Sequence, residues 1–170
     1  MWWVVWIVVA ILTSVGAVAL IGSRLPRGHQ MTRTTRLKLP PDALFAILVD
    51  VDNYRTWRPD VRNVQRLPDC DGRPAWVEEM SAGRIPMFFE GMERPSLLVG
   101  RIADSRLPFG GSWTYRIAAA DEGSELSITE HGEVYNPIFR FMSRFVFGHT
   151  ATMDTFIKHL QAKVALGGSQ

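Results

Sequence analysis

The N-terminal segment constrains the chain most, because no charged side chain occurs between Trp2 and Gly22. At a rise of roughly 1.5 Å per residue, a helix over this run is about 30 Å long and matches the hydrocarbon core of a bilayer. A cleaved signal peptide would have a basic start and a shorter apolar region, although the small residues of Ala17-Val18-Ala19 leave cleavage open. A buried core helix is seldom apolar on every face. We therefore expect a retained transmembrane helix at residues 1–23.

Basic residues on one side of this run predict its orientation. Only the terminal amine precedes the run, whereas several cations follow it: Arg24, Arg27, Arg33, Arg36 and Lys38. The positive-inside rule then predicts a single-pass protein of the cell membrane with its C-terminal domain in the cytoplasm. Arg24 and Arg27 would lie near anionic headgroups, and Trp2, Trp3 and Trp6 would lie in the opposite interface.

Composition indicates one folded domain after the apolar run. The 170-residue chain is 46% hydrophobic and 21% charged, which excludes a disordered tail. Its formal net charge is only +2, and no dense basic patch is interleaved with stacking aromatics, so we expect no nucleic-acid partner. The single cysteine, Cys70, allows no intrachain disulfide, and its two aspartate neighbours disfavour a reactive thiolate.

Residue patterns predict a strand, two short helices, six further strands and a long helix. Residues 30–39 alternate between apolar and polar side chains, and Pro40-Pro41-Asp42 is typical of a helix start. A second helical turn is expected at residues 52–57. Short Gly- or Pro-containing turns then separate antiparallel strands expected at residues 61–67, 74–81, 85–93, 97–103, 112–119 and 125–135.

The last predicted helix begins at Asn136, a good N-cap residue, with Pro137 at its first position. Apolar side chains recur along it at helical spacing, and Gly167-Gly168 ends it: Ile138, Met142, Phe145, Val146, Met153, Phe156, Ile157, Leu160 and Val164. A curved sheet must cover one apolar face, and this helix is the element able to do so. The predicted organisation is a transmembrane helix at 1–23, a linker at 24–29, a domain at 30–166 and a tail at 167–170.

Four stretches carry a family resemblance: residues 39–48 (LPPDALFAIL), 51–60 (VDNYRTWRPD), 109–115 (FGGSWTY) and 126–134 (LSITEHGEV). With the element order, they resemble the SRPBCC superfamily, the helix-grip group that includes START lipid-transfer domains, polyketide cyclases and Bet v 1-type allergens. The resemblance covers roughly residues 30–165 and implies an α+β helix-grip fold, with a curved antiparallel sheet of about seven strands wrapped around a long C-terminal helix. It also implies a deep, mostly apolar cavity between sheet and helix, and it carries over no catalytic motif.

Large apolar side chains are the candidates to line such a cavity, although each also suits a filled core. Glu130 joins them because it shares strand parity with Leu126 and Ile128, which predicts an inward carboxylate unless a bulge turns it to the rim. His149 falls inside the apolar helical stripe, either as a hydrogen-bonded core histidine or as a polar anchor in the cavity. The predicted ligand-binding residues are Trp57, Trp76, Phe88, Trp113, Tyr115, Glu130, Met142, Phe145, His149, Met153 and Phe156.

Residues 138–147 are unusually aromatic and also contain Arg140 and Arg144. Phe141 and Phe147 lie outside the apolar stripe of the last predicted helix. Their rings either pack under the approach of the last strand or form an apolar gate facing the bilayer, with the arginines at the headgroups.

The favoured function is the binding or transfer of an apolar small molecule, such as a lipid, quinone, isoprenoid or polyketide, at the membrane bilayer. The alternative is a cyclase or aromatase acting on a hydrophobic polyketide-like substrate, with Glu130 and His149 as acid–base groups. A third interpretation is a partner-binding domain with a filled core. The sequence has no metal motif, phosphate loop or dinucleotide fingerprint, so we expect no metal and no cofactor. Binding is favoured over catalysis because no catalytic constellation is evident.

Overall fold

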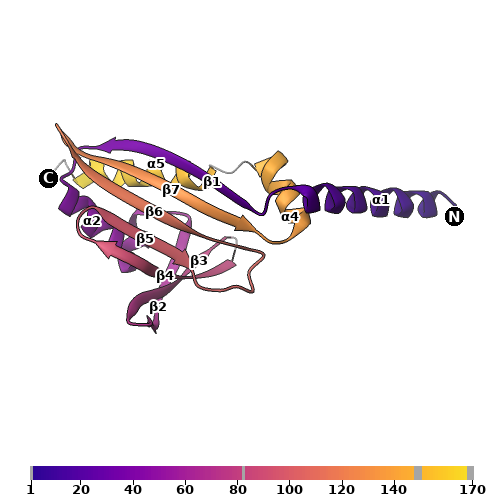
Figure 1. Ribbon diagram of the computed structural model, residues 1–170, viewed down its shortest axis with the longest axis horizontal. Helices are drawn as coiled ribbons and strands as arrows, with labels where there is room; N and C mark the ends of the chain where they lie inside the picture. The colour runs from indigo at the N-terminus through magenta and orange to yellow at the C-terminus, as the bar shows by residue number, and fades with distance from the viewer. Residues whose placement is uncertain (1, 82, 148–150, 168–170) are drawn as a thin grey trace.

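The structure, a computed structural model, describes residues 2–81, 83–147 and 151–167. It contains a seven-stranded sheet and several helices (Figure 1). The strands are β1 (Gly28–Leu37), β2 (Val61–Cys70), β3 (Arg73–Met80), β4 (Gly83–Glu93), β5 (Leu97–Ile102), β6 (Phe109–Ala120) and β7 (Gly123–Val134). The helices are α1 (Trp2–Arg24), α2 (Pro41–Val49), α3 (Tyr54–Trp57), α4 (Pro137–Met142) and α5 (Ala151–Gly167), with a 3₁₀ turn η1 (Val51–Asn53) and a π-helical turn η2 (Ser143–Phe147).

The sheet is antiparallel throughout and has the order β1-β7-β6-β5-β4-β3-β2. Strands that follow one another along the chain are neighbours from β2 to β7, as the short predicted turns require. β1 lies at one edge of the sheet and pairs with β7. The predicted α+β helix-grip fold is confirmed, with α5 lying along one face of the curved sheet (Figure 1).

One end of the sheet adjoins the C-terminal end of α1, and we call it the α1 end. β1 starts there directly after the linker, His29 pairs with Gly132 near the end of β7, and Gly132 pairs with Gly111 near the start of β6. The other strands also have paired residues at or toward this end of the sheet: Arg101↔Ser112, Met87↔Ile102, Glu78↔Ile85 and Val61↔Met80. Figure 1 shows α1 projecting away from this end.

The opposite end of the sheet is filled by a compact apolar core. Leu44 and Leu48 lie one helical turn apart on α2, and both are fully buried. They belong to the same apolar cluster as Leu98 of β5, Leu126 of β7 and Leu160 of α5. The filled core therefore separates this end from the sheet surface near α1.

The predicted C-terminal helix begins as expected, with Asn136 as its N-cap and Pro137 in the first turn, but the prediction that its first half covers the sheet is wrong. Met153, Leu160 and Val164 of α5 are buried under the sheet, as the stripe predicts. In contrast, Ile138 on α4 is 41% exposed and Phe145 on η2 is 60% exposed. α4 packs beside α1 instead of covering the sheet, so the apolar stripe of one sequence segment serves two different surfaces (Figure 1).

α1 is long and apolar enough to cross a membrane, by its length and composition alone. Its apolar side chains are exposed, with Trp2 at 82% and Leu12 at 65%, which contradicts a buried core helix. A signal sequence near the N-terminus meets the same criteria of length and hydropathy.

Candidate functional site

A cavity of about 350 Å³ lies on the concave face of the sheet, at the α1 end. The strands supply its floor, and α4, η2 and α5 supply residues opposite them. Its lining is predominantly apolar, with Met80, Ile85, Met87, Ile102, Phe109, Trp113, Tyr115, Ile128, Val134, Phe139, Met153 and Phe156. This volume falls near the lower end of the range for small-molecule pockets, about 300–1,000 Å³.

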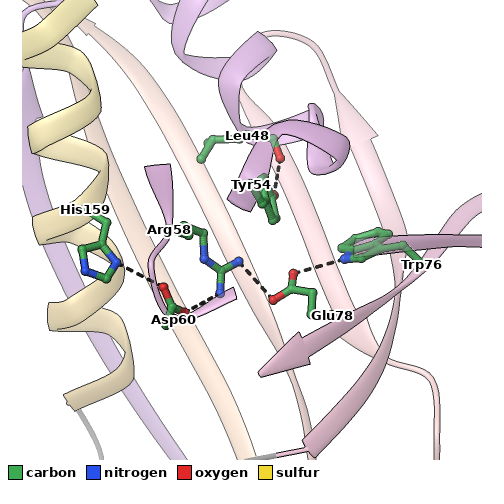
Figure 2. A network of polar contacts seen from close by, with 7 residues as sticks. All are labelled: Leu48, Tyr54, Arg58, Asp60, Trp76, Glu78 and His159. Atoms are coloured by element: carbon green, nitrogen blue, oxygen red, sulfur yellow. Dashed lines mark hydrogen bonds and ion pairs between the residues drawn. The ribbon is translucent and has the colours of Figure 1, made fainter. Parts of the chain in front are cut away.

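Arg58, Asp60 and Glu78 line one side of this cavity. They belong to a network of polar contacts (Figure 2). Arg58, just after α3, contacts Glu78 of β3 through Nη1 at 3.1 Å and Asp60 through Nη2 at 2.9 Å. Glu78 also accepts a hydrogen bond from the indole N–H of Trp76 at 3.1 Å. His159 of α5 contacts the other Asp60 oxygen through Nδ1 at 3.1 Å. Five side chains from three segments, namely β3, α5 and the turn between α3 and β2, are thus linked in one chain of polar contacts.

The Arg58 guanidinium is enclosed as well as paired. It lies 5.0 Å from the ring centroid of Tyr54 and 5.4 Å from that of Phe156, both within reach of a cation–π interaction. Burial would lower the pKa of Arg58, but the charges of Glu78 and Asp60 outweigh burial and raise it. Burial likewise opposes ionisation of Asp60, yet its hydrogen bond and charge interaction with Arg58 leave the Asp60 pKa below its ordinary value. Arg58 is therefore a permanent cation in the cavity wall.

Arg58 also has donor capacity beyond its two carboxylate partners. Its Nε is buried, and no hydrogen-bond partner for it occurs within the described part of the chain. A buried donor of this kind is costly unless a ligand or water satisfies it. Together with its place in the lining, this makes Arg58 the strongest candidate to bind an oxygen atom of a ligand.

A second polar pair lies on the β1–β7 side of the cavity. Glu130 of β7 is 9% exposed, and its Oε1 lies 3.4 Å from Nε2 of His29 on β1. The predicted inward direction of Glu130 is confirmed, since the residue lines the cavity. Burial lowers the pKa of His29, so its imidazole is predominantly neutral at pH 7.

Gly132 makes the space that His29 occupies. A Cβ atom at Gly132 would collide with Cε1 and Nε2 of the His29 ring. The imidazole therefore lies over the backbone of β7, where any side chain at position 132 would displace it. This close approach positions His29 beside Glu130.

Tyr115 provides a hydroxyl group near both the Arg58–Glu78 pair and Glu130. It lies on β6 and lines the cavity, and its ring centroid is 5.7 Å from that of Phe156. Burial raises the pKa of Tyr115 well above its ordinary value. The phenol thus stays protonated at neutral pH and can donate a hydrogen bond.

The structure separates the predicted site residues into three groups. Those that line the cavity are Trp113, Tyr115, Glu130, Met153 and Phe156, and their role in ligand binding stays a prediction. The remaining described residues are not part of the lining: Trp57 and Trp76 lie in the core, Phe88 packs under Arg73, Phe145 is mostly exposed, and Met142 is half-buried. His149 lies outside the described residues.

Arg58, Asp60, His29 and Glu78 are cavity residues that the sequence patterns did not identify. Glu78 had a usable signal, because it shares strand parity with the buried Trp76 and therefore points inward. Arg58 and Asp60 flank Pro59 in a segment that reads as a turn, and nothing local distinguishes them from surface residues. Across the part of the chain that the structure describes, no three His, Cys, Asp or Glu side chains gather as they would around a metal ion.

The fold and the cavity together define a helix-grip protein of the START and Bet v 1 type. Residues 28–165 match the family described as polyketide cyclase / dehydrase and lipid transport, so the chain belongs to that family and the SRPBCC resemblance is confirmed. No curated protein sequence matches the chain.

Solved structures share this fold at low sequence identity. The di-domain aromatase/cyclase StfQ of the steffimycin biosynthetic pathway has a TM-score of 0.66 at 10% identity, covering 84% of this chain and 52% of that one. The Zhui aromatase/cyclase from Streptomyces sp. R1128 has a TM-score of 0.63 at 12% identity, covering 81% and 94%. A START superfamily protein from Mycobacterium smegmatis has a TM-score of 0.62 at 15% identity, covering 81% and 98%. The chain thus spans about half of the StfQ chain and nearly all of the other two.

Proposed function

We propose that this protein is a membrane-anchored domain that binds or transfers an apolar small molecule carrying a carbonyl or hydroxyl oxygen. The observation that carries the proposal is a largely apolar cavity whose wall contains a buried, permanently charged guanidinium. Apolar pockets with a few fixed polar groups bind by burial and orient by hydrogen bonding. A lipid, quinone, isoprenoid or polyketide-like molecule has this combination of properties.

The polar groups would recognise an oxygen rather than a full negative charge. Arg58 is already balanced by Glu78 and Asp60, so an additional carboxylate or phosphate would meet two like charges nearby. The remaining Nε donor and the Tyr115 hydroxyl suit a carbonyl oxygen, and Glu130 suits a hydroxyl group. The cavity volume favours one small molecule or one lipid tail over a complete phospholipid.

Membrane anchoring through α1 is the second part of the proposal. The exposed apolar surface of α1 supports a retained span, and its C-terminal turn contacts α4. The cations that follow α1 support a cytoplasmic domain. An intact-mass measurement of the protein extracted from membranes, combined with protease protection in vesicles, tests retention and orientation.

Ligand binding is tested by extracting and identifying small molecules from the full chain purified in detergent. The wild-type protein is compared with Ile85→Trp, which would fill the cavity, and with Val99→Trp, whose position is not part of the lining. We expect the wild type and Val99→Trp to retain a common apolar molecule that Ile85→Trp lacks. Equal extracts from all three proteins would contradict a ligand held in this cavity.

A second candidate function is a cyclase- or aromatase-type enzyme, in keeping with the aromatase/cyclase structures that share the fold. The specific observation in its favour is His29 beside Glu130, a predominantly neutral imidazole next to a carboxyl group in the cavity. Such a pair is suited to proton transfer. A ligand recovered chemically changed by the wild type but unchanged by His29→Gln would favour catalysis over binding.

A further inference from the structure

We infer that α4 and η2 form a portal in the membrane interface, through which an apolar ligand passes between the bilayer and the cavity without crossing bulk water. The portal segment is Pro137–Phe147. This inference rests on the proposed membrane anchoring and apolar-ligand binding. It adds a route for the ligand and an interaction surface whose partner is the lipid bilayer.

The portal segment packs against the C-terminal end of α1, the proposed span. Gly22 is buried in α1, and a Cβ atom there would collide with the carbonyl oxygen of Pro137. Arg140 of α4 is only 6% exposed, and its Nη1 donates to the carbonyl oxygens of Gly22 and Leu25, both at 3.0 Å. A cation at the carbonyl end of a helix is electrostatically favourable.

The Arg140 guanidinium also binds backbone carbonyl groups at the end of β7. Nε of Arg140 donates to the carbonyl oxygen of Val134 and Nη2 to that of Tyr135, each at 3.0 Å. One buried side chain thus connects the last turn of α1, the linker and the end of β7. The position of the span therefore sets the position of the portal and of the α1 end of the sheet.

The depth of the portal follows from the length of α1. Its 23 residues extend about 34 Å at 1.5 Å per residue, slightly more than a hydrocarbon core of about 30 Å. The final turn, with Gly22 and Arg24, consequently lies at the boundary between acyl chains and headgroups. α4, packed against that turn, lies at the same depth.

The surface of the portal suits this depth. Four of its side chains are apolar and largely exposed: Ile138 at 41%, Phe139 at 48%, Phe145 at 60% and Val146 at 58%. Contiguous exposed apolar groups mark an interaction surface, and here they continue the apolar surface of α1. Arg24, Arg27 and Arg144 are exposed cations in the same region, where anionic headgroups would lie. The bilayer is thus the partner that matches both the apolar and the basic groups.

The portal segment also forms part of the cavity wall. Phe139 and Ser143 line the cavity together with Phe109 and Val134 at the α1 end of the sheet. Phe139 is both half exposed on the outer surface and part of the lining. The cavity and the proposed membrane surface therefore share a single thin wall.

Depth-dependent quenching in vesicles tests the portal. In a Cys70→Ser background, single cysteines are introduced as Leu20→Cys in α1, Val146→Cys in the portal and Glu122→Cys in the β6–β7 turn at the far end of the sheet. Each full-length protein is labelled with a fluorophore and placed in vesicles of phosphatidylcholine and phosphatidylglycerol. A phosphatidylcholine with a nitroxide near its headgroup is then the quencher.

We expect the labels at positions 20 and 146 to lose fluorescence to a similar extent, and the label at position 122 to be unaffected. A label at position 146 that behaves like the one at position 122, while position 20 is quenched, would overturn the portal and leave anchoring intact. No quenching at position 20 would overturn the anchoring and the portal together.

Ligand capture provides a second test that does not require the labels. The double variant Ile138→Ser/Val146→Ser removes two exposed apolar side chains that are not part of the cavity lining. With an uncharged fluorescent polyene alcohol as the probe, we expect slower capture from vesicles but unchanged affinity in detergent solution. An unchanged capture rate would overturn the portal, whereas no binding of the probe by the wild type in detergent would count against this class of ligand and against its proposed route.

Discussion

Arg58 and Glu78 form an ion pair at 3.1 Å, and each side chain is only 9% exposed. Removing two charges from water costs several kcal/mol per ion, so such a pair contributes little net stability of its own. What the pair does provide is a rigid, charged group in an otherwise apolar wall. Its arrangement with Trp76 and Asp60 holds that group in one orientation (Figure 2).

Breaking this pair from one side should destabilise the protein strongly. Arg58→Met leaves the buried Glu78 and the half-buried Asp60 without their cation, and we expect a loss of about 3–5 kcal/mol. The double variant Arg58→Met/Glu78→Leu should recover part of that loss because it removes the uncompensated charge at position 78. Denaturant unfolding of the full chain in detergent measures both effects.

Arg94→Ala is the matched control for this experiment. Arg94 pairs with Asp42 at 3.0 Å, but both side chains are about two-thirds exposed. We expect a loss of less than about 1 kcal/mol there. If Arg58→Met costs no more than Arg94→Ala, the buried network does not have the structural role described.

Gly132→Ala should displace His29 and weaken the His29–Glu130 contact. The added methyl group would overlap the imidazole ring, and overpacking of this kind typically costs about 1–3 kcal/mol. Gly28→Ala is the control, since a Cβ at Gly28 comes no closer than 3.9 Å to another atom. The thermal midpoints of the two variants and the His29 ring signals in NMR spectra provide the comparison. Equal behaviour of the two variants would show that His29 does not depend on the missing side chain.

The stability of the protein should decrease as the pH falls below 6.5, the ordinary pKa of histidine, in part because of His29. Burial lowers the pKa of His29 in the folded protein, so the unfolded chain binds the proton more readily. Stability therefore rises with pH through this interval and is lost on acidification, until the lowered folded pKa is reached. In His29→Gln, the contribution of His29 to the change of stability with pH should be absent. Thermal midpoints measured above and below pH 6.5 test the prediction, and parallel slopes in the two proteins would contradict it.

The strands and the direction of Glu130 were predictable because a strand places alternate residues on opposite faces. Leu126, Ile128 and Glu130 share one parity on β7, and all three are buried. The same rule applies to Trp76 and Glu78 on β3. On a regular strand, the two-residue period predicts the face of the sheet on which each side chain lies, whatever surrounds the strand.

The remaining site depends on contacts that no local pattern encodes. His29 on β1 contacts Glu130 on β7, two strands far apart in the sequence, and the contact depends on the absence of a side chain at Gly132. Arg58 follows α3 and Glu78 lies on β3, and neither local segment predicts that they meet. The apolar stripe of residues 138–164 has one helical period, but periodicity cannot show that Arg140 draws its first part toward α1.

Gly22→Val should separate α1 from the portal, whereas Gly16→Val should not. At position 22 any Cβ would meet the backbone of Pro137, which cannot move aside as a flexible side chain would. At position 16 nothing lies within 4 Å of an added Cβ, and valine keeps the span apolar. With the label at position 146, we expect Gly22→Val to reduce lipid quenching and Gly16→Val to match the parent protein. Quenching unchanged by Gly22→Val would show that the portal reaches the bilayer without the Gly22–Pro137 contact, and the depth of the cavity would then have to be set by the exposed apolar side chains alone.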